Sequence, residues 1–132
     1  MKSDIDIKDE IFLALKGSTL TKAVTGQLLK TRRPKNSTKE DIIISVLANE
    51  GSQKQEAVVN VNIYVEDNVI DGQPEEDTIR LRELCNVAEE TLKTTRIRTV
   101  LLKIAPPRVF EAEGGIGWHI INNRISYKII NE

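Results

Sequence analysis

The sequence predicts an α+β fold in which two main helices pack on an antiparallel or mixed β-sheet of about four to five strands. Two observations support this class. Segments with helical periodicity and segments with strict alternation follow one another as helix, strands, helix, strands, without the regular βαβ repetition of a parallel fold. The apolar residues are mostly Ile, Val and Leu, which favours a sheet-centred core. With 132 residues, we expect one domain spanning residues 1–132.

The first predicted helix covers residues 4–16, where apolar side chains recur every four residues on one face. These side chains are Ile7, Ile11 and Leu15. Ser3 or Asp4 is suited to cap its start, and Gly17 is a natural stop. Residues 24–29 are compatible with a short strand. Residues 30–39 contain Pro, Asn and Ser and predict a loop.

Residues 42–48 and 55–65 predict two strands of an antiparallel hairpin, joined by a turn at residues 49–52. The second strand alternates apolar and polar residues with a clear period of two. In the first strand, Ile43 and Leu47 are apolar residues on the second face, so we expect both faces of this strand to be buried. The opposite face of the first strand is expected to carry Ile42, Ile44, Val46 and Ala48.

The second half of the chain predicts an acidic loop, a helix and two strands. The loop is expected at residues 66–76 and the helix at residues 77–92. A strand at residues 99–104 ends at the following Ala-Pro-Pro step. Residues 114–117 are rich in Gly and predict a turn before the last strand, residues 118–130.

The residues from which catalytic and metal sites are usually built are scarce. The chain has one His and one Cys, far apart in sequence, and no Gly-x-Ser-x-Gly motif. Cys85 falls on the apolar side of the second helix and predicts a buried thiol, whereas His119 predicts a packed or rim histidine. We therefore expect no enzyme, no catalytic residue, and no cofactor-binding or metal-binding residue. A site built only from carboxylates remains as a rival hypothesis.

Charge is sorted along the chain although the net charge is only −1. Residues 11–39 contain seven basic and no acidic residues, residues 55–78 contain seven acidic and no basic residues, and residues 91–110 are again basic. Solvated loops would explain this pattern. So would contacts between unlike surfaces of neighbouring copies, which suit a head-to-tail assembly. A third interpretation is a small nucleic-acid-binding module that uses the basic loops.

The order of these features resembles the tail-terminator, or tail-completion, proteins of long-tailed bacteriophages and prophages. The matching pieces are the N-terminal helix, the basic loop with its Arg33-Pro34 step, the hairpin that ends in Val59-Asn-Val-Asn-Ile-Tyr-Val65, the second helix and the final strand. The stretch at residues 93–117 has no counterpart in this pattern.

The resemblance implies a single tail-terminator-like domain without enzymatic activity that self-associates into a ring, usually a hexamer. Such a ring ends the tail tube and joins it to the head, so its partners would be tail-tube and head-completion proteins. We expect no membrane association and no nucleic-acid partner, and a location in the bacterial cytoplasm and then in the virion tail. The expected inter-subunit or partner contacts are Arg32, Arg33, Lys35, Glu66, Asp67 and Asp71.

Overall fold

The computed structural model describes residues 1–51, 54–114 and 116–130. This part of the chain holds a six-stranded mixed sheet, a separate two-stranded sheet and three helices. The helices are α1 (Asp4–Leu15), α2 (Thr19–Ala23) and α3 (Thr78–Thr94). The strands are β1 (Leu28–Leu29), β2 (Ile42–Gly51), β3 (Gln55–Glu66), β4 (Asn68–Ile70), β5 (Gln73–Glu75), β6 (Val100–Ile104), β7 (Arg108–Glu111) and β8 (Trp118–Ile129). The α+β class is confirmed, with more strands than expected.

The large sheet is built around the long strands β3 and β8. Its order is β1-β2-β3-β8-β6, and β7 pairs with β8 as well. Only the β1–β2 pair is parallel. Strands β6 and β7 pair with successive parts of β8 on the same side, because Pro106 and Pro107 interrupt the run between them. The expected strand at residues 99–104 is confirmed as β6, and β7 was not predicted.

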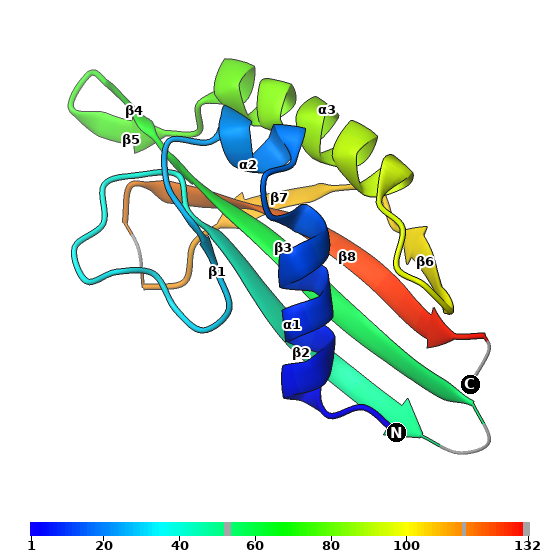
Figure 1. Cartoon of the computed structure of the whole chain (residues 1–132). Coiled ribbons are helices and arrows are strands. Elements are labelled where there is room, and N and C mark those ends of the chain that lie inside the picture. The colour runs from blue at the N-terminus through cyan, green and yellow to red at the C-terminus, as the bar shows by residue number, and fades with distance from the viewer. Residues whose placement is uncertain (52–53, 115, 131–132) are drawn as a thin grey trace.

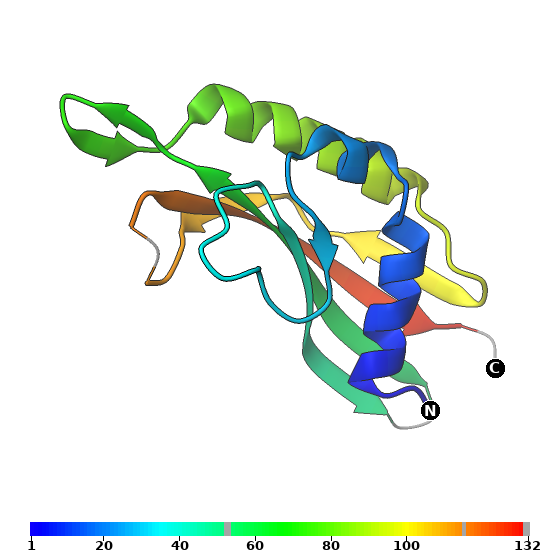
Figure 2. The ribbon, with the colours of Figure 1, turned by 60° about the vertical axis from the view of Figure 1, so that its left-hand side comes forward.

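All three helices lie on one face of this sheet, as Figures 1 and 2 show. Alternate residues of β3 and β8 turn towards the helices and are buried, in agreement with the predicted period of two. The sheet side of this core includes Val59, Val61, Ile63, Ile121, Ile125 and Tyr127. No helix covers the other face within the described residues, and we call it the helix-free face.

A β-bulge in β2 changes which side chains face the helices. Val46 lies opposite Val59, but Ala48 lies opposite Val58, so Leu47 is an extra residue in the ladder. The prediction that Ala48 shares a face with Ile42, Ile44 and Val46 is therefore wrong. The expected cover on both faces is also wrong at Leu47, whose side chain is 57% exposed.

The start and end of α1 agree with the sequence prediction. The Ser3 hydroxyl accepts a hydrogen bond from the Asp6 amide, and the Asp6 carboxylate accepts one from the Ser3 amide, so the two residues form a capping box. The hydrogen bond from the Ser3 backbone is the main reason why the pKa of Asp6 is lowered. Gly17 follows the helix with a φ of +73°, a conformation that glycine adopts without strain.

Two expected segments have a different structure. The segment at residues 24–29, expected as a strand, contains only the two-residue β1, and α2 precedes it. Residues 66–76 are not a loop, because β4 and β5 form a hairpin there. Its turn residues Asp71 and Gly72 both have positive φ, as a tight two-residue hairpin turn requires. The turn predicted at residues 49–52 is wrong at residues 49–51, which continue β2 in register with β3. Residue 52 of that turn and residue 115 of the other predicted turn lie outside the described residues.

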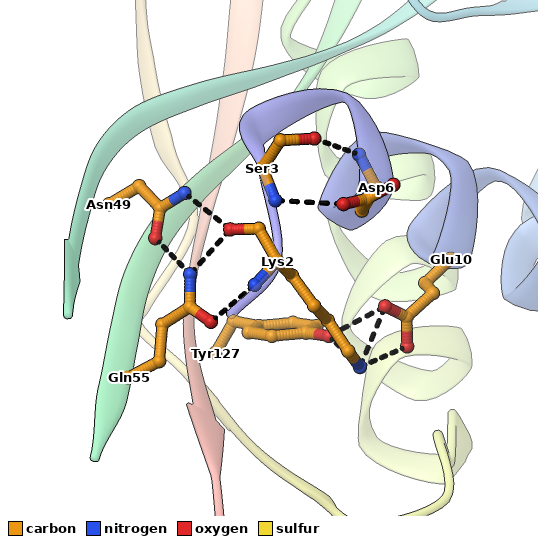
Figure 3. A network of polar contacts seen from close by, with 7 residues as sticks. All are labelled: Lys2, Ser3, Asp6, Glu10, Asn49, Gln55 and Tyr127. Atoms are coloured by element: carbon orange, nitrogen blue, oxygen red, sulfur yellow. Dashed lines mark hydrogen bonds and ion pairs between the residues drawn. The ribbon is translucent and has the colours of Figure 1, made fainter. Parts of the chain in front are cut away.

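A polar network joins the N-terminus to the end of the sheet (Figure 3). The fully buried Tyr127 donates its hydroxyl proton to Glu10 at 2.9 Å and accepts a hydrogen bond from Lys2 Nζ at 2.9 Å. Lys2 Nζ also pairs with Glu10 at 2.8 Å. The side-chain amide of Gln55 forms hydrogen bonds with the backbone of Lys2 and with the side chain of Asn49. The network therefore fastens the chain start to β2, β3 and β8.

Replacing Tyr127 by Phe removes the hydroxyl from this network and leaves the Lys2–Glu10 pair in place. We expect Tyr127→Phe to lower the free energy of unfolding by about 1–2 kcal/mol, because two hydrogen bonds to charged groups are lost. Urea denaturation followed by circular dichroism measures this. The control is Tyr64→Phe, since the Tyr64 hydroxyl makes no hydrogen bond with the described residues. Equal effects of the two variants would contradict the role of the Tyr127 hydroxyl.

Candidate interaction surface

The two segments that carry the predicted contact residues, the basic loop with Arg32, Arg33 and Lys35 and the acidic segment with Glu66, Asp67 and Asp71, lie at one end of the sheet. Both views show the loop between β1 and β2 and the β4–β5 hairpin at this end, with the hairpin projecting away from the body (Figures 1 and 2). The basic loop and the acidic segment of one copy are therefore neighbours. A head-to-tail contact between these two segments would instead need them on opposite sides of the molecule.

The basic loop is held in place by the buried carboxylate of Asp41, whose residue is 1% exposed. Asp41 Oδ2 accepts hydrogen bonds from Arg33 Nε at 3.0 Å and from Ser37 Oγ at 2.6 Å. Asp41 Oδ1 accepts one from the Gln27 amide at 3.0 Å. Burial alone would raise the pKa of Asp41. The bonds from Ser37, Gln27 and Arg33 outweigh burial and hold that pKa below its ordinary value.

Arg33 is a structural residue of this loop, with only 18% of its side chain exposed. Its guanidinium carbon lies 4.5 Å from the ring centre of Tyr64 and 4.2 Å from that of Trp118. This cation–π stacking joins the loop to β3 and β8. Arg33 Nη2 also donates to the Lys39 carbonyl at 2.8 Å. Reversing the charge of Arg33 would therefore disturb the fold, whereas Arg32 is exposed and can be reversed alone.

A second ion pair ties the same loop to α3. Arg80 donates two hydrogen bonds to the Glu40 carboxylate, at 2.8 and 2.7 Å, and a third to the Ala23 carbonyl at 2.8 Å. Gly26 lies against Asp41 and the backbone of Glu40, where no Cβ would fit. The loop is thus fixed at its base, and its outer part carries the exposed Arg32 and Lys35.

Among the acidic residues, Asp67 is also engaged within the molecule. Its Oδ1 lies 2.6 Å from His119 Nδ1, and the two side chains are only 6% and 14% exposed, respectively. The Asp67 amide donates to the Gly117 carbonyl at 2.8 Å. His119 is therefore a packed histidine at the rim of the sheet, as predicted. Glu66 and Asp71 remain exposed.

A hollow of about 450 Å³ lies beside Asp67 and Trp118. Its described lining also includes Glu111, Ile116 and Pro74, and contains no Ser, Thr, Cys or Lys that could act as a nucleophile. In the described ranges, no three His, Cys, Asp or Glu side chains form a group that could hold a metal ion. Cys85 is half-buried against the core, and burial raises the pKa of its thiol.

The helix-free face carries a second group of positive charges, of which two come from the basic stretch predicted at residues 91–110 and two from β8 were not predicted as contacts. We call this group the basic patch, and its members are Lys103, Arg108, Arg124 and Lys128. Within the described chain, neither Lys103 nor Arg124 makes an ion pair, and Lys128 lies 3.3 Å from the exposed Glu56. Part of this patch could have been predicted from the alternation of apolar and polar residues in β8, which puts Arg124 and Lys128 on its polar side.

An amide cluster lies beside the basic patch in the middle of the same face. Asn122 Nδ2 donates to Asn60 Oδ1 at 3.1 Å and to Asn62 Oδ1 at 2.7 Å. A hollow of about 300 Å³ lies between Lys103 and Arg124 and is lined by Val58 and Ser126 as well. The part of the face around Lys103 and Arg124 is therefore polar and positive, and its side chains suit a partner that brings acidic groups.

Comparison with known proteins adds no relationship, because no family model and no curated protein matches this chain. Across the ranges given above, no helix has both the length and the apolar character that crossing a membrane requires.

The Asp41 carboxylate leads to a prediction about pH. We expect Asp41→Asn to lower the free energy of unfolding at pH 7 by about 2–4 kcal/mol, because Arg33 loses its buried partner. Folding lowers the pKa of Asp41 below its ordinary value of 3.8, so the ionised carboxylate stabilises the folded protein at pH values above 3.8. This stabilisation is lost as the pH falls through the pKa of Asp41 in the folded state. The difference from wild type should therefore shrink in acid.

Urea denaturation at pH 7 and at pH 3 measures both effects. The matched control is Asp9→Asn, which removes an exposed ion pair with Lys30 and should cost less than about 1 kcal/mol. A loss for Asp41→Asn that is the same at both pH values would contradict the assigned role of the carboxylate.

Proposed function

We propose that this protein is a structural assembly protein that self-associates into a ring, of the kind that ends a phage or prophage tail tube and joins it to the head. In this role it has no enzymatic activity. It assembles in the bacterial cytoplasm with tail-tube and head-completion proteins and then remains in the virion tail. The observation that carries the proposal is the projecting β4–β5 hairpin.

The hairpin exposes apolar side chains that the described part of the chain leaves uncovered. Val69 is 74% exposed and Ile70 is 49% exposed, and every residue of both strands is exposed. An isolated two-stranded hairpin is only marginally stable in water, so an ordered one normally packs against another surface. A neighbouring copy would supply that surface and would bury the apolar side chain on the hairpin face that it covers, Val69 or Ile70.

The arrangement of elements also supports the proposal. Helix α1, the β2–β3 hairpin, helix α3 and strand β8 follow in the order on which the resemblance to tail terminators rests. Strands β6 and β7 occupy the stretch that has no counterpart in that pattern. A contact between two different surfaces of identical copies closes into a ring when the rotation between them allows it.

A second candidate function is binding of single-stranded nucleic acid. The observation that favours it is the helix-free face, where Arg108 lies two residues from Phe110, which is 43% exposed, and Arg124 follows further along β8. Open sheet faces that carry cations and aromatic rings bind single strands by phosphate contacts and base stacking. This function predicts binding that weakens steeply with salt.

The hairpin supplies the test of the assembly proposal. We expect wild-type protein to form rings at high concentration, seen by light scattering after size-exclusion chromatography and by negative-stain electron microscopy. Changing Val69→Ser and Ile70→Ser together should weaken self-association at least tenfold, because exposed apolar side chains of this size contribute about 1–2 kcal/mol each when buried. The monomer should keep its circular dichroism spectrum.

The control for this variant is Ile5→Ser on the outer side of α1, where Ile5 is 69% exposed. It changes a similarly exposed apolar residue far from the hairpin and should assemble as wild type does. A wild-type protein that stays monomeric at every concentration, also when tail-tube protein is added, would overturn the proposal.

A further inference from the structure

We infer that the β4–β5 hairpin of one copy docks on the basic patch of the helix-free face of the next copy. The inference rests on the proposed function and names the two surfaces that meet in the ring. It commits to one occupant of the patch, a second copy of this chain, because the charges and the exposed apolar residues of the two surfaces are complementary.

The acceptor surface follows from the register of the sheet. Lys103 lies opposite Ser126, Arg108 lies opposite Asn122, and Arg124 stands between these two positions on β8. Side chains two residues apart along a strand lie about 7 Å apart on the same face. The cations of β6, β7 and β8 therefore form a continuous positive strip, with the hollow of about 300 Å³ between Lys103 and Arg124.

Apolar side chains flank this positive strip. Leu101 is 41% exposed and pairs in register with Lys128, whereas Phe110 is 43% exposed and pairs with Ile120. Both lie on the helix-free face, at opposite ends of the strip. The acceptor thus combines positive charge in its middle with exposed apolar groups at its edges, a pattern that suits an acidic partner with apolar side chains of its own.

The hairpin has the matching properties. The segment at residues 55–78 contains no basic residue, and Asp71, Glu75 and Glu76 are exposed in or directly after the hairpin. Val69 and Ile70 supply exposed apolar side chains beside these acids. Lys103 and Arg124 would meet carboxylates. Val69 and Ile70 are consecutive in β4 and point to opposite faces of the hairpin, so Leu101 or Phe110 would cover the one on the docked face.

The hairpin does not reach the Lys103–Arg124 part of the patch of its own chain, although its Pro74 lines a hollow together with Glu111 of β7. It leaves the sheet where β3 ends, opposite Trp118, and projects away from the body (Figures 1 and 2). The hollow between Lys103 and Arg124 is bordered by Ser126, eight residues further along β8, which corresponds to about 26 Å. Donor and acceptor therefore lie on different parts of the molecule. This is the condition for a head-to-tail contact that repeats from copy to copy.

Charge reversal tests the docking. We expect Lys103→Glu with Arg124→Glu to raise the apparent dissociation constant of the assembly at least tenfold, because like charges then face each other. Adding Asp71→Lys and Glu75→Lys to the same chain should restore much of the assembly, since the two reversed positions of the patch then face opposite charges again. The control Lys16→Glu with Lys22→Glu makes the same charge change on the helical side of the molecule and should assemble normally.

Sedimentation velocity at several protein concentrations measures assembly, and circular dichroism shows that each variant is folded. If wild type assembles and the patch variant assembles equally well, the inference is overturned while the proposed function stands. If wild type does not assemble at any concentration, also when tail-tube protein is added, the proposed function is overturned together with the inference. If the patch variant assembles normally but loses binding of a fluorescent mixed-sequence single-stranded DNA, the patch is a nucleic-acid surface and the inference is wrong.

Discussion

Because β3 and β8 pair along almost their whole length, from Glu56 opposite Lys128 to Glu66 opposite Trp118, they divide the molecule into two unlike sides. Residues of one parity are mostly apolar and pack against the helices, and residues of the other parity are mostly polar, charged or aromatic. A shift of this pairing by one residue would exchange the two sides completely. The buried core, the loop held on Tyr64 and Trp118, and the basic patch all depend on this single register.

Much of the fold could be predicted from the sequence, because it follows local rules. The alternation in β3, the apolar stripe of α3 and the cap at Ser3 are each visible within a few neighbouring residues. The bulge at Leu47 could not be predicted, since one inserted residue changes the face of Ala48 without any change of composition. Strand β7 was not predicted because its four residues are all exposed and do not alternate between apolar and polar types. The Asp71-Gly72 pair is typical of a two-residue hairpin turn, but the many acidic residues around it led to the prediction of a loop.

The sorting of charge along the chain was visible from the sequence, but the use of each charge was not. Arg33 and Asp67 were expected at a surface, and both are held by internal partners. The partner of Asp67 is 52 residues away, and the rings against Arg33 come from two different strands. Such contacts appear only after the strands are in register. Arg124 and Lys128, in contrast, could be placed on the polar side of β8 from the sequence. The sequence did not predict that the cations of β6 and β7 lie beside them, because this depends on which strands pair with β8.

The two prolines between β6 and β7 have a consequence for this edge of the sheet. A continuous strand along this edge of β8 would present a long row of free amide and carbonyl groups to solvent, and such edges add strands from other molecules. Pro106 and Pro107 break the edge into two short pieces and remove two amide donors. Extension of the sheet into a fibril is thereby disfavoured at this edge. Contacts through side chains, which can stop at a defined number of copies, are left as the favoured way to associate.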